Sequence, residues 1–226
     1  MSTESFAELG YALIPAAIAD EDCVEAIQQV EHLALTSTSA GSRNLLALFW
    51  CRELAAALKS STALVALLPA KAVAVQCTLF EKTAEMNWGV AVHQDLSIPV
   101  RERVSGLGFT GWAQKEGVLY TQPPPEVLAN VVAIRIHLDP CPAHAGPLRV
   151  VPGSHSNGRL SNSEITRFCV QRGEVECLAD RGDALVMRPL LLHASSRAAG
   201  NDKRRVLHFL FGPRDLPYGL TWHEAV

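Results

Sequence analysis

Short strand-like segments separated by glycine and proline turns fill the last two thirds of the chain. Asn130–Leu138 alternates between two faces, with Val132, Ile134, Ile136 and Leu138 on one of them, which is the period of a β-strand. Several short strands with such turns indicate a sandwich or a barrel. Further strands are predicted at Gly10–Ile14, Ala72–Phe80, Glu174–Leu178, Ala184–Met187, Leu190–His193 and Arg205–Phe211.

The first third of the chain is predicted to be mostly helical. Asp20 is predicted to cap a helix with acidic residues in its first turn, and a Ser/Thr/Gly loop follows at Thr36–Ser42. Two more helical regions cover about Asn44–Lys59 and Thr62–Leu68. With 226 residues, the chain suits one domain, residues 1–226, in which helices of about 1–70 brace a β core of about 71–213.

Charge and hydropathy exclude some classes of protein. A formal net charge of −3 gives no basic surface for nucleic acid or an anionic membrane. The polar, acidic start lacks the apolar stretch of a signal peptide, and no apolar run approaches the length of a membrane span. The six cysteines have no C-x-x-C spacing, which predicts reduced thiols in a cytoplasmic protein. We expect a monomer or a homodimer.

A candidate metal site begins at Val92–Leu96, which reads as a short strand that runs into a loop. Residues two apart on a strand point to the same side, so His93 and Asp95 would direct an imidazole and a carboxylate at one point. These are two ligands of the 2-His-1-carboxylate triad, which binds non-haem Fe(II) and leaves three positions open. His193, after the apolar run Leu190–Leu192, is the best candidate for the third. The alternative is a hydrogen-bonded structural cluster of the same three residues.

Several short motifs follow one another from Glu81 onward. They are Glu81-Lys82-Thr83, Asn87-Trp88, His93-Gln94-Asp95, Leu138-Asp139-Pro140-Cys141, the stretch from Gly146 to His155, His193-Ala194-Ser195-Ser196 and Arg204-Arg205. This ordered set resembles the phytanoyl-CoA dioxygenase family of Fe(II)/2-oxoglutarate oxygenases, over about Val73–Gly212. The resemblance implies a mainly β fold with flanking helices, whose core is a double-stranded β-helix (a cupin-like jelly roll).

The resemblance also implies a reaction and the residues that support it. Fe(II), 2-oxoglutarate and O2 would hydroxylate a C–H bond of a small organic molecule, with release of succinate and CO2. The far carboxylate of 2-oxoglutarate needs a charged, forked partner, which favours Arg over Lys. In the family this Arg follows the distal His by about eleven residues, which falls on Arg204. Other residues expected to line or border the cosubstrate pocket are Ser195, Thr78, Arg135, Asn87 and Trp88.

Some of these assignments have structural alternatives. Ser195 would instead cap a turn, and Arg135 would be a surface charge on its strand. Arg204 and Arg205 begin one strand and so point to opposite faces. The set containing Arg205 is the more apolar one and includes Leu207, Phe209 and Phe211. The apolar set that contains Arg205 suits an outer face covered by helices, and the more polar set that contains Arg204 suits the interior around a metal site. Arg204 is therefore predicted to face the cosubstrate, with Arg205 as the alternative.

Leu96–Glu126 is long and rich in Gly, Pro and charged residues. Long loops in compact domains often bind ligands or act as lids. We therefore predict a loop here that selects and covers the substrate.

Other functions remain compatible with the same residues. The metal centre could catalyse desaturation, epimerisation or ring formation, because the fate of an oxidised substrate depends on the shape of its pocket. A non-catalytic module that binds a metal or 2-oxoglutarate is an alternative from a different class. The motifs do not identify the substrate.

Overall fold

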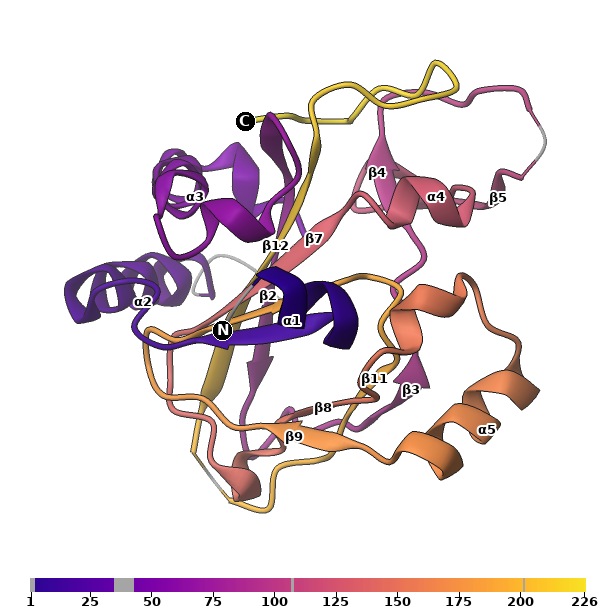
Figure 1. Cartoon of the computed structure of the whole chain (residues 1–226). Coiled ribbons are helices and arrows are strands. Elements are labelled where there is room, and N and C mark those ends of the chain that lie inside the picture. Colours follow the sequence, from indigo (N-terminus) through magenta and orange to yellow (C-terminus); the bar gives the residue numbers. More distant parts are fainter. Residues whose placement is uncertain (1–2, 35–42, 107, 201) are drawn as a thin grey trace.

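The computed structural model of the chain describes residues 3–34, 43–106, 108–200 and 202–226, so the predicted Thr36–Ser42 loop lies outside it. Two antiparallel sheets pack around a shared apolar interior (Figure 1). This is the double-stranded β-helix that the sequence predicts. The larger sheet has the order β1 (Tyr11–Ile14), β10 (Ala184–Met187), β7 (Val132–His137), β12 (Arg204–Pro213), β2 (Ala72–Lys82), and the smaller has β3 (Val90–His93), β11 (His193–Ser195), β8 (Leu148–Val150), β9 (Val175–Cys177).

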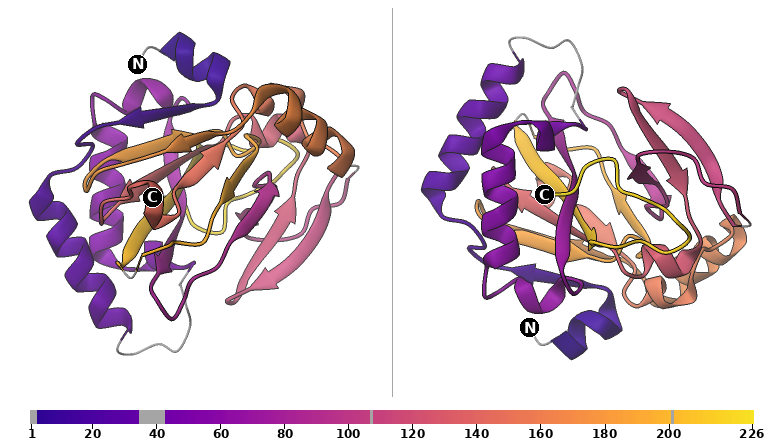
Figure 2. Two further views of the ribbon diagram at one scale, coloured as in Figure 1. Left: turned by 90° about the horizontal axis from the view of Figure 1, so that it is seen from below. Right: turned by 90° about the horizontal axis from the view of Figure 1, so that it is seen from above.

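Helices cover the outer face of the larger sheet (Figure 2). Helix α2 (Asp20–Ala34) includes the predicted cap residue Asp20 as its first residue, and it packs with α3 (Phe49–Ser60) against that face. The predicted second helix is divided, since a 3-10 turn at Leu45–Ala47 precedes α3. The predicted third helix is only a 3-10 turn, and a short first helix was not predicted. The 3-10 turn is Val65–Leu67, and the short first helix is α1 (Thr3–Leu9). The other α-helices of the described residues are α4 (Pro125–Leu128) and α5 (Asn162–Arg172), and two more 3-10 turns lie at Ala143–Ala145 and Ser154–Asn157.

Strand β12 separates two environments. Leu207, Phe209 and Phe211 are completely buried in the cluster that the sheet forms with α2 and α3. The alternate residues point into the barrel, where Arg204, His208 and Leu210 line a cavity. A pleated strand presents successive side chains to opposite faces, so the aromatic set belongs to the helix-covered side. The structure therefore has the strand face that the sequence predicts for Arg204.

The prediction that Leu96–Glu126 is a loop is wrong, because much of this segment is folded into strands. This segment forms a third antiparallel sheet, with the strand order β4 (Ile98–Val100), β6 (Val118–Gln122), β5 (Thr110–Lys115), and ends in α4. Strands β5 and β6 meet at Glu116-Gly117, where both residues have positive φ (49° and 80°). Two positive-φ residues at a hairpin tip match the twist of the flanking strands. The glycines therefore mark a tight hairpin in a sheet.

The end of the apolar run before His193 also differs from the prediction. Leu190–Leu192 precede the strand, and β11 covers only His193–Ser195. The Leu191 N–H donates to the Arg188 carbonyl at 3.0 Å, as in a turn. This turn delivers His193 to the edge of the barrel opposite β3, where it pairs with His93. No helix among the described residues is long and apolar enough to cross a membrane.

Candidate active site

Strands β3 and β11 bring the three predicted metal ligands together. His193 pairs directly with His93 across the two strands, and Asp95 follows β3 by two residues. Asp95 Oδ1 lies 3.6 Å from His93 Nε2, and Oδ2 lies 3.6 Å from His193 Nε2. One donor atom from each of the three residues lies within 4.8 Å of the others. Two ligands of one metal at about 2.0–2.2 Å each are at most about 4.4 Å apart, so both His–Asp separations suit a shared ion.

Each imidazole presents its Nε2 atom to the site. His93 Nδ1 lies 2.9 Å from the Ala91 carbonyl oxygen, and His193 Nδ1 lies 2.9 Å from that of Leu191. A carbonyl can only accept, so both Nδ1 atoms carry the proton and both Nε2 atoms keep a lone pair. This arrangement is typical of metal-binding histidines, whose second nitrogen is held by a hydrogen bond.

The protonation of the cluster suits a metal ion. Burial lowers the pKa of His193, which keeps its imidazole neutral. Burial opposes the ionisation of Asp95, but His193 and His93 outweigh it and hold the pKa of Asp95 below its usual value. The interaction with the Asp95 carboxylate, 3.6 Å from His93 Nε2, raises the pKa of His93 and so favours a proton on that nitrogen. A metal ion would take the place of that proton, because metal ligands must be deprotonated.

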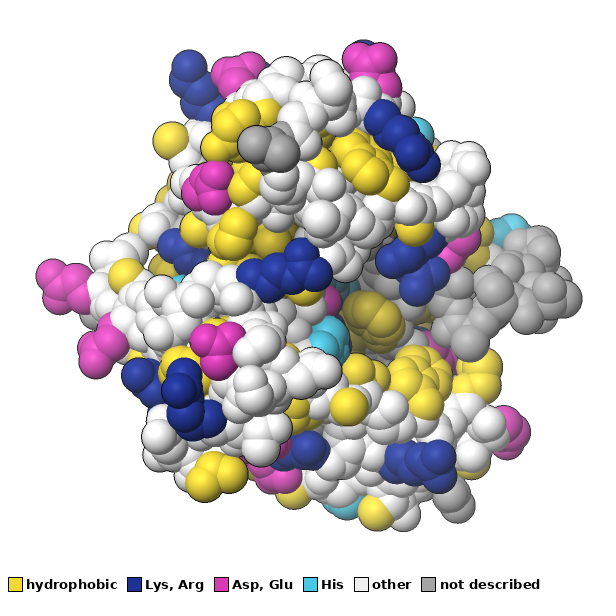
Figure 3. All heavy atoms as spheres, turned by 90° about the vertical axis from the view of Figure 1, so that its right-hand side faces the viewer, with side chains coloured by type: hydrophobic (Ala, Val, Ile, Leu, Met, Phe, Trp, Pro, Cys, Tyr) yellow, Lys and Arg dark blue, Asp and Glu magenta, His cyan; other side chains and the backbone are white. Residues whose placement is uncertain are grey.

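The three residues lie in the wall of a cavity of about 350 Å³ inside the barrel. The face in Figure 3 is hollowed near its centre, with histidine and hydrophobic side chains in the hollow and Lys or Arg side chains on both sides. Thr78, Arg135, Ser195 and Arg204, all predicted for the cosubstrate pocket, line the cavity, and so does Trp88. The third sheet contributes Leu96, Ser97, Lys115, Tyr120 and Gln122 to the same wall.

One end of the cavity holds a buried cationic cluster. Lys82, 1% exposed, donates to Ser195 Oγ at 2.8 Å and to the Ser196 carbonyl at 2.5 Å. Arg204 donates from a terminal guanidinium nitrogen to the Gly146 carbonyl, while its buried Nε has no partner among the described residues. Gly146 has φ +67°, and a Cβ there would meet the Ser196 carbonyl at 2.5 Å. Only glycine therefore lets this turn approach so closely.

Arg205 occupies a different environment from its neighbour. Its guanidinium forms a bidentate pair with Asp139, with Nε to Oδ2 and a terminal nitrogen to Oδ1 both at 2.8 Å. A further 2.8 Å contact joins it to Glu31 of α2. Asp139 is the main reason that the pKa of Arg205 is raised. Arg205 thus connects the sheet to a covering helix and does not line the cavity.

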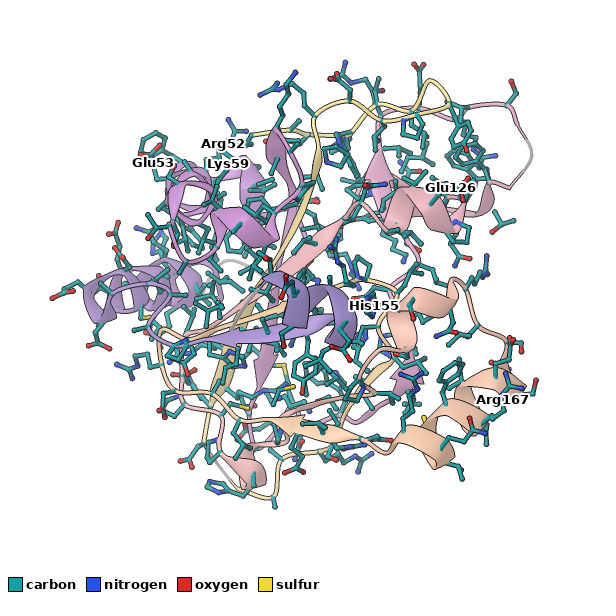
Figure 4. The ribbon with its side chains drawn as sticks, in the orientation of Figure 1. Arg52, Glu53, Lys59, Glu126, His155 and Arg167 are labelled. Atoms are coloured by element: carbon teal, nitrogen blue, oxygen red, sulfur yellow. The ribbon has the colours of Figure 1, made fainter. Side chains whose placement is uncertain are left out.

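Two other predicted residues have structural contacts. Asn87 does not line the cavity, because its amide donates to the Ala198 carbonyl at 2.7 Å and accepts from the Ala198 N–H at 2.8 Å. This favours a structural role over cosubstrate binding. His155, the last residue of the motif stretch from Gly146, lies beside α1 (Figure 4), and its Nε2 is 3.1 Å from the Ala7 carbonyl.

Neither Lys82 nor His208, which both line the cavity, was predicted as a site residue, although Lys82 belongs to the motif Glu81-Lys82-Thr83. Both have the strand parity of predicted site residues, since Lys82 shares a face of β2 with Thr78, and His208 shares a face of β12 with Arg204. The alternation of side chains along β2 and β12 is therefore the signal in the sequence that identifies both residues.

The fold and the site together define a jelly-roll protein with a 2-His-1-carboxylate constellation at the mouth of its barrel. The sequence matches the phytanoyl-CoA dioxygenase (PhyH) family over residues 6–206. The chain belongs to this family.

Several solved structures share the fold. The epimerase SnoN from nogalamycin biosynthesis, described as non-haem and α-ketoglutarate-dependent, is 15% identical, with a TM-score of 0.67 and coverage of 99% of this chain and 87% of that one. The carbocyclase SnoK, from the same biosynthesis and likewise α-ketoglutarate-dependent, is 12% identical, with a TM-score of 0.69 and coverage of 96% and 84%. HygX from Streptomyces hygroscopicus, with nickel and 2-oxoglutarate bound, is 18% identical, with a TM-score of 0.67 and coverage of 96% and 89%. No curated protein sequence matches the chain.

Proposed function

We propose that this protein is an Fe(II)- and 2-oxoglutarate-dependent oxygenase that hydroxylates a C–H bond of a small organic molecule. The main support is the convergence of two free Nε2 atoms and one carboxylate in the wall of a cavity that also contains Arg204. The family match supports the same class of enzyme. Iron, 2-oxoglutarate and O2 supply the oxidising chemistry, in which 2-oxoglutarate becomes succinate and CO2 while the substrate is oxidised.

The residues of the chain have separate roles in this proposal. His93, Asp95 and His193 hold Fe(II) through Nε2, a carboxylate oxygen and Nε2. Arg204 binds the far carboxylate of 2-oxoglutarate, as supported by its buried Nε, which has no partner in the part of the chain that the structure describes. Ser195 donates to the same carboxylate, and Lys82 positions its hydroxyl through the 2.8 Å hydrogen bond. Burial and the charge of Arg204 lower the pKa of Lys82 to about 8, which a bound anion would reverse.

Succinate release tests the proposed class of enzyme. The protein would be supplied with Fe(II), 2-oxoglutarate, ascorbate and a panel of small metabolites, and succinate and substrate-derived products would be measured. A hydroxylated product contains one added oxygen atom, whereas an epimerised, desaturated or cyclised product does not. If no succinate forms with any metabolite of the panel, and none forms when no metabolite is added, a non-catalytic binding module is favoured.

Arg204→Ala is expected to raise the apparent KM for 2-oxoglutarate about tenfold or more. Loss of a charge-assisted hydrogen bond costs on the order of 1.5–3 kcal/mol, and about 1.4 kcal/mol corresponds to a factor of ten. Initial rates of succinate formation at varied 2-oxoglutarate give this KM. Arg205→Ala, assayed at a temperature at which it is folded, should change the KM little. If neither substitution alters the KM, 2-oxoglutarate is not the cosubstrate.

The third sheet is proposed to act as a lid. It lines the cavity, and its hairpin tip is held by the preceding part of the chain, since Arg43 donates to Glu116 through its backbone and its guanidinium, both at 2.8 Å. Trypsin is expected to cut after exposed Arg101 or Arg103, between β4 and β5. Zn(II) with 2-oxoglutarate should slow this cleavage, because a lid becomes less accessible on closing. Unchanged cleavage rates would contradict the lid.

A further inference from the structure

The cavity contains many more cationic than anionic side chains. Among the residues that line it, only Asp95 carries a carboxylate, whereas five are cationic: Arg43, Lys82, Lys115, Arg135 and Arg204. Lys82, Arg135 and Arg204 are buried, and no carboxylate of the described residues forms an ion pair with them. Burying an unpaired cation is costly, so the anions that balance these charges are expected to be ligands.

The cosubstrate of the proposed function accounts for only part of this charge. One carboxylate of 2-oxoglutarate would bind the metal beside Asp95, and the other would bind Arg204 with Ser195 and Lys82. Arg135 remains without an anionic partner among the described residues. Its backbone lies away from that of Arg204, because Arg135 pairs with His208, four residues along β12 from Arg204. Four residues correspond to roughly 13 Å along a strand, at a rise of about 3.3 Å per residue.

Arg135 is held in place at the cavity wall. A terminal guanidinium nitrogen lies 3.0 Å from His208 Nδ1, and the guanidinium carbon lies 5.3 Å from the centre of the Phe80 ring. Its Nε is buried and has no partner among the described residues. Arg135 is only 7% exposed, and its pKa is lowered to about 10, mainly by burial and then by Arg204. The side chain is thus oriented before any ligand arrives.

The neighbours of Arg135 across the sheet add further donors. Thr78, His208 and Arg135 are aligned on β2, β12 and β7. An arginine can only donate, so His208 Nδ1 accepts and the proton of this neutral ring is on Nε2. Thr78 Oγ1 accepts from Gln76 Nε2 at 2.8 Å, which leaves its hydroxyl hydrogen available. A row that offers hydrogen-bond donors suits a ligand group that only accepts, and an ionised carboxylate is such a group.

We propose that Arg135, with His208 and Thr78, binds a carboxylate of the organic substrate, so that the enzyme acts on small carboxylic acids. This inference rests on the proposed function, because it assigns both carboxylates of 2-oxoglutarate to the metal and to Arg204. It replaces the sequence-based expectation that Arg135 serves the cosubstrate. The apolar walls of the cavity, which include Leu96, Leu148 and Leu210, would contact the hydrocarbon part of the acid.

Acid and amide pairs of equal size test the proposal without turnover. Zn(II), which has no redox chemistry, would replace iron, and 2-oxoglutarate would be saturating. Binding of pentanoate and pentanamide, and of benzoate and benzamide, would be measured by ligand-observed NMR and by calorimetry. At least one acid should bind about tenfold more tightly than its amide, as expected for a charge-assisted contact. Arg135→Gln should remove this preference, and Arg135→Lys should keep part of it.

Two further measurements separate this carboxylate site from a general effect of charge and from the cosubstrate site. Lys115→Gln removes one cation at the cavity wall, away from the row, and should preserve the preference for acids. The affinity for 2-oxoglutarate should fall about tenfold or more in Arg204→Gln but less than about threefold in Arg135→Gln.

Three results would overturn the proposal. They are the lack of any acid preference in the natural protein, an unchanged preference in Arg135→Gln, and loss of 2-oxoglutarate affinity in Arg135→Gln equal to that in Arg204→Gln. If the natural protein does not bind 2-oxoglutarate at all, the proposed function fails. The acid–amide comparison in the Zn(II)-loaded protein then still determines whether Arg135 selects carboxylates.

Discussion

His193→Ala is expected to abolish succinate formation and to leave the fold intact. The substitution removes one of the three donor atoms that lie within 4.8 Å of one another, and the two that remain form an incomplete site. His93→Ala and Asp95→Ala should have the same effect. The fold should persist because the hydrogen bond that holds the His193 ring is local: among the described residues its Nδ1 bonds to the Leu191 carbonyl, within its own turn. Succinate formation and the far-ultraviolet circular dichroism spectrum measure the two effects.

Metal binding gives an independent readout of the same substitutions. Competition between the protein and a chelating dye for Co(II) or Zn(II) should show one tight site in the natural protein, and its affinity should fall about tenfold or more in each alanine variant. His223→Ala is the matched control, because His223 is exposed and does not line the cavity. An alanine variant of the triad that keeps both metal affinity and turnover would show that the three residues are only a structural cluster.

Arg205→Ala is expected to lower the free energy of unfolding by about 3–5 kcal/mol, the usual cost of removing one partner from a buried ion pair. The substitution leaves the buried Asp139 carboxylate without its bidentate partner and breaks the contact to Glu31 of α2. Asp139 and Arg205 side chains are 10% and 9% exposed, so water cannot easily replace the lost contacts. Urea denaturation followed by circular dichroism measures the loss.

A second arginine pair provides the control for this experiment. Arg149 contacts Glu174 at 2.6 Å, but the two side chains are 27% and 28% exposed. More exposed ion pairs contribute about 0–1 kcal/mol, so Arg149→Ala should have a much smaller effect. Asp139→Asn should resemble Arg205→Ala, because it leaves the guanidinium buried without a counter-charge. If Arg205→Ala and Arg149→Ala destabilise the protein equally, the buried pair does not stabilise the connection between the sheet and the helix.

Local residue patterns account for much of what the sequence predicted. The alternation of polar and aromatic residues along β12 predicted correctly that Arg204 faces the cavity and that Phe209 faces the helices. A strand with one face covered by helices can accommodate an aromatic row on that face and a polar row on the other. The spacing of His93 and Asp95 also predicted that their side chains would meet, and Asp95 Oδ1 lies 3.6 Å from His93 Nε2, although Asp95 lies two residues beyond the end of β3. The role of Arg204 in cosubstrate binding stays a prediction, since its position alone does not identify a ligand.

Features that depend on non-local pairing could not be predicted in this way. The glycines of residues 96–126 indicated a loop, but pairing of β4 with β6 turns the segment into a sheet, and nothing within the segment specifies that partner. Lys82 reaches Ser195, 113 positions later in the chain, only because β2 and β11 face the same interior. The two hydrogen bonds of the Asn87 side-chain amide, one donated and one accepted, likewise depend on the backbone of Ala198, 111 residues away.

The way in which both histidines are held has a consequence for how this scaffold can diversify. Each Nδ1 binds a carbonyl two residues earlier in its own strand or turn, so no other side chain is needed to orient either ring. Residues elsewhere in the barrel can therefore be exchanged without releasing the rings. Arg135, Phe80 and Tyr120 form a part of the interior that evolution or an engineer can rebuild for a new ligand, while the metal-binding atoms keep their positions.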